Sequence, residues 1–543
     1  MLEIVKGAEE FNIPIIRANR KLVASINGGL QYPSVLVFNP KWGTSQHQPP
    51  KSNRFKYPSS SATLRRPSND EDIAFMTITE LGQLIKTKQI TSLELTKIFL
   101  RRLKRYNGVL KAVVSYTEEL AYKQAKRADY LLDKGVYLGP LHGIPYGLKD
   151  IISVPKYKTT WGSTTFKNQV LNTEAWVYKR LKSAGAVLVA KLVSGMVPFA
   201  IEPTDKHIGN ILNFYLAPHQ YRNCLYGIHI LKSSITYSKI DHINLALWDL
   251  GTLRSFPQAH LRPHVWLHCH WAEENGFNHL WSDEPPLVGE SLDKVGPFCR
   301  DAADCAIVLD VIRGKDPNDM SSRDMPFKDP FSVDITKLRV GYVGDAEMEV
   351  VKVLESKGVK MVPFKLNYTV DSVQGILNFT MDVDMLAHFD EWQRSGSDRA
   401  YEAQEQWPIE LRRARLIPAV DYVQAQRARG RLIREVEDNL KGIDGFIGNA
   451  TDWEKVCMGN LVGMPVIVVP TGLKPISHPP PNTRRRTTIT TAIYAPPQHD
   501  HIGLALAMAY QSVTHHHKQR PPIDDLGPHD VLHIPSPPPS PLP

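Results

Sequence analysis

The sequence predicts an α/β fold in which a mixed, twisted sheet is covered by helices on both faces. Segments with helical periodicity alternate with short apolar segments over residues 77–191, and the alternation resumes after residue 290. This pattern is typical of parallel strands joined by helical crossovers, which bury both faces of the sheet. The 543 residues, 42% of them hydrophobic, suffice for one large core or for two to three smaller domains.

In the first half of the chain, two capping boxes predict where helices begin. They are Thr77-x-x-Glu80 and Thr91-x-x-Glu94, in which side chains satisfy free amide groups at a helix N-terminus. Apolar residues then recur at helical spacing, at Leu95, Ile98, Phe99 and Leu103. We next expect a strand at 113–116, a helix at 118–134, a strand at 144–152, a helix at 174–184 and a strand at 186–191.

In the second half, the same patterns predict three helices and four strands. The helices are expected at 301–313, at about 419–441 and at 502–513. The strands are expected at 338–343, 446–448, 466–469 and 488–494, where short apolar or β-branched runs occur.

Composition divides the chain into four parts. Residues 1–40 form an N-terminal extension, and residues 41–70 are rich in Ser, Pro, Lys and Arg, which predicts a disordered linker. Residues 71–530 are expected to form the folded domain. Residues 531–543 are proline-rich and cannot form a helix, so we predict a disordered tail.

Bulk properties narrow the possible environments and partners. The net charge is +9, but Lys and Arg are spread along the chain, which favours a solvated basic surface over nucleic-acid binding. Five scattered cysteines do not suggest a disulfide framework, so a reducing compartment is expected. We find no membrane-spanning run and no secretory signal, and therefore expect a cytoplasmic or organellar protein. The oligomeric state is not indicated.

The most informative segment is Gly-Pro-Leu-His-Gly-Ile-Pro-Tyr-Gly-Leu-Lys-Asp, residues 139–150. On a strand, Lys149 shares a face with Pro145 and Gly147, and these stiff or small neighbours leave space around its side chain. Burial favours a neutral amine, which can accept a proton from a serine hydroxyl. On composition alone, a structural lysine at a strand end is the preferred interpretation.

This segment closely resembles the lysine motif of the amidase signature family. Other segments are similar to that family in the same order along the chain, namely 159–164, 175–191, 291–304, 316–319, 460–472 and the final helix. The resemblance covers about 70–200 and 287–530. It implies the amidase-signature fold and hydrolysis of amide C–N bonds.

The resemblance also implies a Ser–Ser–Lys mechanism with Lys149 as general base. In this family the lysine deprotonates a middle serine held on a cis peptide, and that serine activates the serine nucleophile. The nucleophile forms an acyl-enzyme while backbone amides of a Gly/Ser-rich loop bind the oxyanion. The expected substrate is a small-molecule amide, or glutamine if the chain resembles the A subunit of glutamyl-tRNA amidotransferase. No metal or organic cofactor is implied.

The resemblance is lost between residues 200 and 287, where the Gly/Ser-rich loop is expected. No Gly-Gly pair occurs between residues 150 and 290, and residues 200–290 contain nine of the twenty histidines but only five glycines. A loop that binds an oxyanion needs small residues so that its backbone can approach. The Ser-Ser pair in this segment, Ser233-Ser234, lacks flanking glycines and is a weak candidate for the serine site.

Two hypotheses account for this departure. The first is the loss of an exon at Gly195, with non-coding or out-of-frame sequence translated until the family pattern returns near Ser291. The second is a genuine pseudoenzyme that kept the sheet and lost the site. Both predict an amidase-like protein with a degenerate active site and amide turnover near background. A non-catalytic scaffold and a glutaminase subunit of an aminoacyl-tRNA amidotransferase are the alternatives.

A less favoured hypothesis of another class is metal binding. His264, His268, Cys269 and His270 cluster potential metal ligands, and His264 and His268 would share one face of a helix. The spacing does not match a closed tetrahedral set of zinc ligands, so no metal site is assigned.

Overall fold

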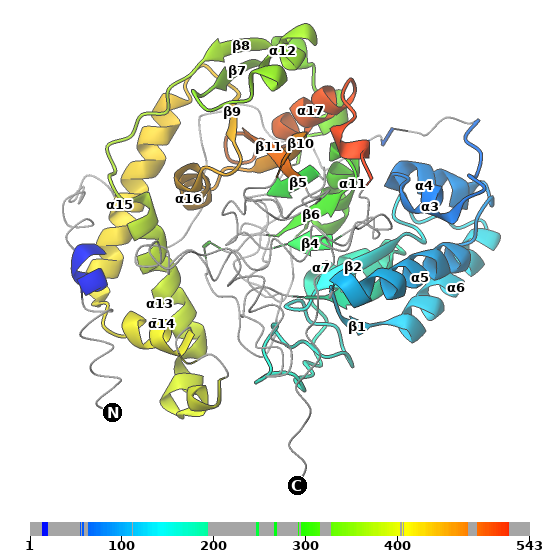
Figure 1. Ribbon diagram of the computed structural model, residues 1–543, viewed down its shortest axis with the longest axis horizontal. Coiled ribbons are helices and arrows are strands. Elements are labelled where there is room, and N and C mark those ends of the chain that lie inside the picture. Colours follow the sequence, from blue (N-terminus) through cyan, green and yellow to red (C-terminus); the bar gives the residue numbers. More distant parts are fainter. Residues whose placement is uncertain are drawn as a thin grey trace.

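A computed structural model describes residues 14–19, 55, 57–58, 63–110, 112–193, 246–248, 265–268, 291–292, 295–314, 327–401, 404, 407–475 and 486–520. These residues form one eleven-stranded mixed sheet with helices packed around it (Figure 1). The predicted fold class, a mixed sheet covered by helices, is therefore confirmed. None of the described helices is both long and apolar enough to cross a membrane.

The strands follow the order β1-β3-β2-β4-β6-β5-β10-β11-β9-β7-β8 across the sheet. Parallel pairs join β2 to β3 and β4, and β7 to β8 and β9, whereas the central pairs are antiparallel. The bounds are β1 Val113–Tyr116, β2 Pro145–Lys149, β3 Val187–Leu192, β4 Ala246–Trp248, β5 Val265–His268, β6 Gly296–Cys299, β7 Arg339–Tyr342, β8 Lys360–Pro363, β9 Gly445–Asn449, β10 Val466–Pro475 and β11 Arg486–Tyr494.

The described α-helices form two groups, one beside β1–β3 and one that begins beside the central strands β5 and β6 and continues past the rest of the sheet (Figure 1). The first group is α3 Asp70–Ala74, α4 Ile78–Lys86, α5 Ser92–Leu110, α6 Glu118–Asp133 and α7 Trp176–Ser183. The second is α11 Ala302–Ile312, α12 Met348–Ser356, α13 Val373–Arg394, α14 Trp407–Ala414, α15 Ala419–Asn439, α16 Trp453–Val462 and α17 Asp500–Gln511. Short 3-10 turns lie at Pro330–Ser332, Ile335–Lys337, Ser397–Ala400 and His516–Lys518.

Local hydrogen bonds explain where the first helices begin. At α4 the capping box is complete, because Thr77 accepts from the Glu80 amide while the Glu80 carboxylate accepts from the Thr77 amide. At α5, the Thr91 hydroxyl accepts from the Glu94 amide at 3.0 Å. The four apolar residues predicted to share one face of α5 are all buried: Leu95, Ile98, Phe99 and Leu103.

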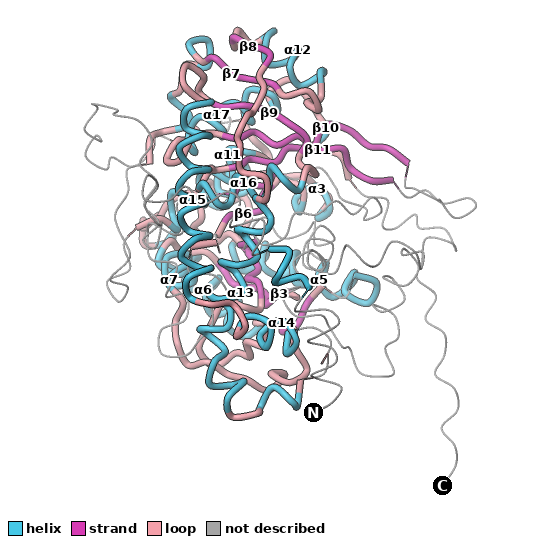
Figure 2. Tube along the Cα trace, turned by 90° about the vertical axis from the view of Figure 1, so that its left-hand side faces the viewer, coloured by secondary structure: helices cyan, strands magenta, loops and turns pink. Residues whose placement is uncertain are grey.

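Two strands differ in length from the prediction by more than two residues. The strand expected at 144–152 ends at Lys149, because the chain then turns and the Ile152 amide donates to the Lys149 carbonyl. The strand expected at 466–469 continues to Pro475 as one arm of the β10–β11 hairpin. Among the described residues, β10 pairs with β5 through residues 466–468. The later residues of β10 pair with β11, and this part of the hairpin projects beyond the rest of the sheet (Figure 2).

Two aromatic residues that precede α3 pack against the second half of the chain. The Phe55 ring lies 4.8 Å from the Phe327 ring in an edge-on arrangement, and the Tyr57 hydroxyl donates to Asp310. Both lie within the segment interpreted as a linker from its composition. At these positions the chain is therefore held against the folded domain.

An ion pair is buried between α13 and α14. Arg413 Nε and Nη2 donate to Asp382 Oδ2 at 3.0 Å and 2.7 Å, and both side chains are almost fully buried. Burial raises the pKa of Asp382 to about 6; the positive charge of Arg413 opposes this rise, and the neighbouring Glu410 adds to it. Burial also raises the pKa of Glu410.

This burial predicts a pH-dependent contribution to stability. An unfolded aspartate has a pKa of about 3.9, so the folded chain binds the Asp382 proton more tightly than the unfolded chain does. The contribution is complete below about pH 4 and is lost as the pH rises through about 6. We expect Asp382→Asn to remove this part of the pH dependence in urea unfolding between pH 4 and pH 7, whereas the exposed control Asp371→Asn leaves it unchanged. Equal slopes in both variants would contradict the prediction.

Candidate active site

Lys149 is the last residue of β2, and its side chain is only 1% exposed. In the parallel pair of β2 with β3, Lys149 lies opposite Leu192 and Leu148 lies opposite Lys191. Successive residues of a strand point to opposite faces of a sheet. Lys149 and Lys191 therefore lie on opposite faces of the sheet, although they come from neighbouring strands.

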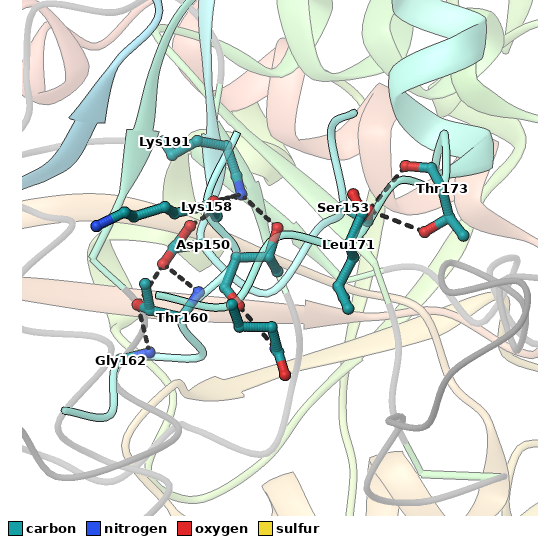
Figure 3. Close-up of polar contacts among 10 residues, drawn as sticks. Asp150, Ser153, Lys158, Thr160, Gly162, Leu171, Thr173 and Lys191 are labelled. Carbon is teal, nitrogen blue, oxygen red and sulfur yellow. Dashed lines mark hydrogen bonds and ion pairs between the residues drawn. The ribbon is translucent and has the colours of Figure 1, made fainter. Parts of the chain in front are cut away.

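Lys191 is held by an ion pair and two further hydrogen bonds in a fully buried setting (Figure 3). Its Nζ donates to Asp150 Oδ1 at 2.8 Å, to the Lys158 carbonyl at 3.0 Å and to Thr159 Oγ1 at 3.1 Å. An ammonium group has three hydrogens to donate, and three acceptors are present. The geometry therefore fits the charged form of Lys191.

Asp150 connects the end of β2 to the turn at 158–162. Its Oδ2 accepts from the Thr160 amide at 2.8 Å and from the Thr160 hydroxyl at 2.5 Å, while its amide donates to the Leu192 carbonyl. Thr160 Oγ1 in turn accepts from the Gly162 amide at 3.2 Å (Figure 3). The carboxylate is fully buried and is compensated by charge and by hydrogen bonds.

Two opposing effects act on the charge of Lys191. Burial lowers the pKa of Lys191, because removing an ammonium from water favours its neutral form. The Asp150 carboxylate raises that pKa and offsets part of the effect of burial. The Asp150 carboxylate thus helps Lys191 to remain charged inside the protein.

The turn after β2 is also fixed to the helical layer. Trp161 has a φ of +53°, a left-handed conformation that is rare and costly for a bulky side chain. Its ring packs 4.7 Å from Phe166 and 6.0 Å from Phe389 of α13. Thr165 Oγ1 donates to the Ala400 carbonyl at 3.3 Å. These contacts hold the turn in place despite its strained backbone.

The candidate serines, Ser233 and Ser234, lie outside the described residues. Among the described serines close to β2, Ser153 has its hydroxyl engaged with the backbone, because its Oγ donates to the Thr173 carbonyl at 2.7 Å (Figure 3). Ser153 therefore fixes a loop, and we do not assign it as a nucleophile.

The metal-binding hypothesis assumed that His264 and His268 lie on a helix, and this assumption is wrong. Residues Val265–His268 form β5, which pairs with β10, so four-residue spacing does not place His264 and His268 on one helix face. His264, Cys269 and His270 lie outside the described residues. Within the part of the chain that is described, no group of three or more His, Cys, Asp or Glu side chains is arranged to hold a metal ion.

Sequence reasoning did not identify Asp150, Lys191 and Thr160 as site residues. A usable signal was present, because Lys191 is a charged residue inside the otherwise apolar run 187–192. Buried charges occur where they are paired, so this lysine indicated a partner on a neighbouring element. The identity of the partner depends on the strand register.

Comparison with known proteins identifies the family. The model of the Amidase family matches residues 94–201 and 287–500, which is more than half of the chain. The chain belongs to the amidase family. This confirms the resemblance drawn from the lysine segment and the segments that follow it. Residues 202–286 lie between the two matched parts.

The curated relatives of this amidase-family protein include proteins named as amidases and proteins named as amidotransferase subunits. The putative amidase AmiD of Mycobacterium tuberculosis is 29% identical over 292 residues, which cover 51% of this chain and 56% of AmiD. The A subunit of the glutamyl-tRNA(Gln) amidotransferase of Sulfurihydrogenibium sp. is 27% identical over 312 residues, which cover 54% of this chain and 61% of that relative. The chain thus spans little more than half the length of these relatives.

Solved structures confirm the amidase-signature fold. A native peptide amidase from Stenotrophomonas maltophilia superposes with a TM-score of 0.62 at 18% identity, covering 82% of this chain and 98% of that one. An amidase family protein from Bacillus anthracis gives a TM-score of 0.64 at 18% identity, covering 83% and 93%. At 18% identity, the likeness to these structures shows a shared fold and is not evidence of a shared substrate.

Proposed function

We propose that this amidase-family chain retains the general-base half of an amide-hydrolysing site, with Lys149 as the base. The observation that carries the proposal is the buried position of Lys149 at the end of β2, in the segment that resembles the family's lysine motif. A buried lysine loses its proton more readily than an exposed one, which suits a base. The ion pair between Asp150 and Lys191 holds the residue that directly follows Lys149 in the chain.

The proposed reaction is hydrolysis of an amide C–N bond by acyl transfer. A serine hydroxyl, deprotonated through Lys149, would attack the amide carbonyl and form an acyl-enzyme. The proton held by the base would then pass to the leaving amine, and water would release the acid. Small-molecule amides are the proposed substrate class.

We further propose that the polypeptide as written turns over amides near background. The two parts of the chain that match the Amidase family leave out the interval 202–286, and this interval contains few of the small residues that an oxyanion loop requires. In that state the protein would act as a non-catalytic amidase-like scaffold. The base would be present without an identified nucleophile.

An amide-hydrolysis assay tests this pair of proposals. We expect the wild-type chain, Lys149→Ala and the exposed-lysine control Lys182→Ala to release ammonia from small aliphatic and aryl amides at the same low rate. In an active enzyme, loss of the base would cost about 10²- to 10⁴-fold. A rate that falls selectively in Lys149→Ala, or a serine labelled by a fluorophosphonate probe, would show that the chain is an active amidase.

The second candidate function is a glutaminase subunit of an aminoacyl-tRNA amidotransferase. It is favoured by the curated relatives that are named as the A subunit of glutamyl-tRNA(Gln) amidotransferase. This function requires glutamine as the amide substrate. Glutamine hydrolysis that exceeds the hydrolysis of simple amides, and that depends on Lys149, would favour it over a free-standing amidase.

A further inference from the structure

We propose that Ser68 is a phosphorylation site for a serine/threonine protein kinase that selects basic substrates. The segment is Arg65-Arg66-Pro67-Ser68, in which two arginines stand three and two positions before a serine. Protein kinases select substrates by the charges around the reacting hydroxyl, and acidic side chains on a kinase complement such a pair of guanidinium groups. The inference is independent of the amide chemistry proposed for Lys149.

Ser68 lies on the surface, in a bend directly before α3. The residue is exposed, and so are Arg65 and Arg66. The Ser68 hydroxyl does not cap the helix, because the Asn69 side chain accepts from the Glu71 amide at 2.9 Å. In the part of the chain that the structure describes, the Ser68 hydroxyl has no hydrogen-bond partner. A kinase could therefore reach this hydroxyl without unfolding a buried part of the protein.

The backbone before Ser68 belongs to neither a helix nor a strand. Gln89 holds it from one side, because its Nε2 donates to the Leu64 carbonyl at 2.9 Å and its Oε1 accepts from the Arg66 amide at 2.8 Å. These are two hydrogen bonds to a single exposed side chain. Exposed segments outside helices and strands are the parts of a fold that modifying enzymes reach.

A second basic segment has the same charge spacing but lies in the sheet. Thr487 and Thr488 follow the run Arg484-Arg485-Arg486. Both threonines belong to β11, and the strand register pairs them with Lys474 and Leu473 of β10. Thr488 is also only 8% exposed. A kinase could bind this strand only after the hairpin had opened, so the structure favours the serine before α3.

Arg66 must leave its contacts on the surface before a kinase can bind its guanidinium group. Its Nη2 donates to Glu94 at 2.5 Å, and its Nη1 donates to the Gln89 carbonyl at 3.5 Å. The side chains of Arg66 and Glu94 are 34% and 41% exposed, and an exposed ion pair of this kind contributes little to stability. These contacts are therefore expected to slow phosphorylation without preventing it.

The proposed reaction transfers the γ-phosphoryl group of ATP to Ser68. A bond forms between Ser68 Oγ and the γ-phosphorus, and the bond from that phosphorus to the bridging oxygen of ADP breaks. The hydroxyl proton passes to a carboxylate of the kinase. The phosphoserine carries a charge of about −1.5 to −2 at pH 7. It directly precedes the acidic first turn of α3, which contains Asp70, Glu71 and Asp72, so phosphorylation makes this surface strongly acidic.

The test is phosphorylation of the purified full chain in vitro. The probe is the catalytic subunit of a cyclic-AMP-dependent protein kinase, which selects basic substrates, with ATP labelled at the γ-phosphate. We expect labelling at Ser68, located by mass spectrometry of peptides. Ser68→Ala is expected to abolish this labelling, whereas Ser332→Ala, at an exposed serine without neighbouring arginines, leaves it unchanged. Arg65→Gln/Arg66→Gln is expected to lower the initial rate at least about 10-fold, the effect of losing charge-assisted hydrogen bonds.

Two further comparisons separate the sequence motif from its setting in the fold. A synthetic peptide of residues 62–74 shows that the kinase is active on the isolated segment. Gln89→Ala frees the backbone at Leu64 and Arg66, and we expect it to raise the rate for the full chain towards that of the peptide. Labelling of the peptide without labelling of Ser68 in the full chain would overturn the inference. So would labelling at Thr487 in place of Ser68, or a rate at Ser68 that does not depend on Arg65 and Arg66.

Discussion

Replacing residues 195–286 with the corresponding Gly/Ser-rich segment of an active family member is expected to raise amide turnover by at least about 10³-fold over the present chain. The expected gain combines a nucleophilic serine with the backbone amides of an oxyanion loop, and loss of one oxyanion donor alone costs about 10²- to 10³-fold. The rest of the machinery is proposed to be in place, since Lys149 and its supporting ion pair are buried at the end of β2.

The variants of this chimera decide whether the gain uses the existing base. Lys149→Ala in the chimera is expected to return turnover to background, and so is the alanine variant of the grafted nucleophilic serine. A chimera with the segment grafted in reversed order serves as the matched control for folding and composition. Turnover that survives Lys149→Ala would show that the grafted segment acts without this lysine, and a folded chimera without turnover would count against the proposed site.

The parts of the fold that follow from the sequence are those with local causes. The start of α4 is determined by the reciprocal hydrogen bonds of Thr77 and Glu80, and both residues are visible in the sequence as a capping box. The buried face of α5 follows from apolar residues at helical spacing. The predicted bounds of β1 and β3 agree with the structure to within one residue, because each strand is a short and mainly apolar run.

Helix α13 shows why other elements could not be predicted. It spans Val373–Arg394, and apolar and acidic residues alternate in its centre without forming one apolar stripe. The helix packs against α14, α15 and α16, so several of its sides are buried, and acidic residues such as Asp382 are accommodated by partners on those helices. A helix that is buried on several sides lacks the periodic signal that identifies a surface helix.

The candidate site likewise contains one part that the sequence predicts and one part that it does not. Lys149 could be proposed from sequence because the residues that identify it are adjacent in the chain. The pairing of Lys191 with Asp150 could not, because it depends on the register of β3 against β2, and a shift of one residue would turn Lys191 to the other face. The strained turn at Trp161 likewise depends on contacts with α13, which lies far along the chain.

Asp150→Ala is expected to lower the free energy of unfolding by about 3–5 kcal/mol, the cost typical of removing one partner from a buried ion pair. Without the carboxylate, the fully buried ammonium of Lys191 loses its counter-ion, and the Thr160 amide loses its acceptor. Urea unfolding at pH 7 measures the change. The matched control is Asp133→Ala, which breaks the exposed pair with Lys88 and is expected to cost less than about 1 kcal/mol.

The double variant Asp150→Ala/Lys191→Met separates the unpaired charge from the lost packing. Because it removes the ammonium together with its counter-ion, no uncompensated charge remains buried, and we expect it to be more stable than Asp150→Ala alone by about 1–3 kcal/mol. Equal instability of the single and double variants would mean that the hydrogen bonds from Thr160 stabilise this region and that the ion pair contributes little. A single variant within about 1 kcal/mol of wild type would mean that Lys191 can shed its proton when Asp150 is absent, a response that the lowering of its pKa by burial permits.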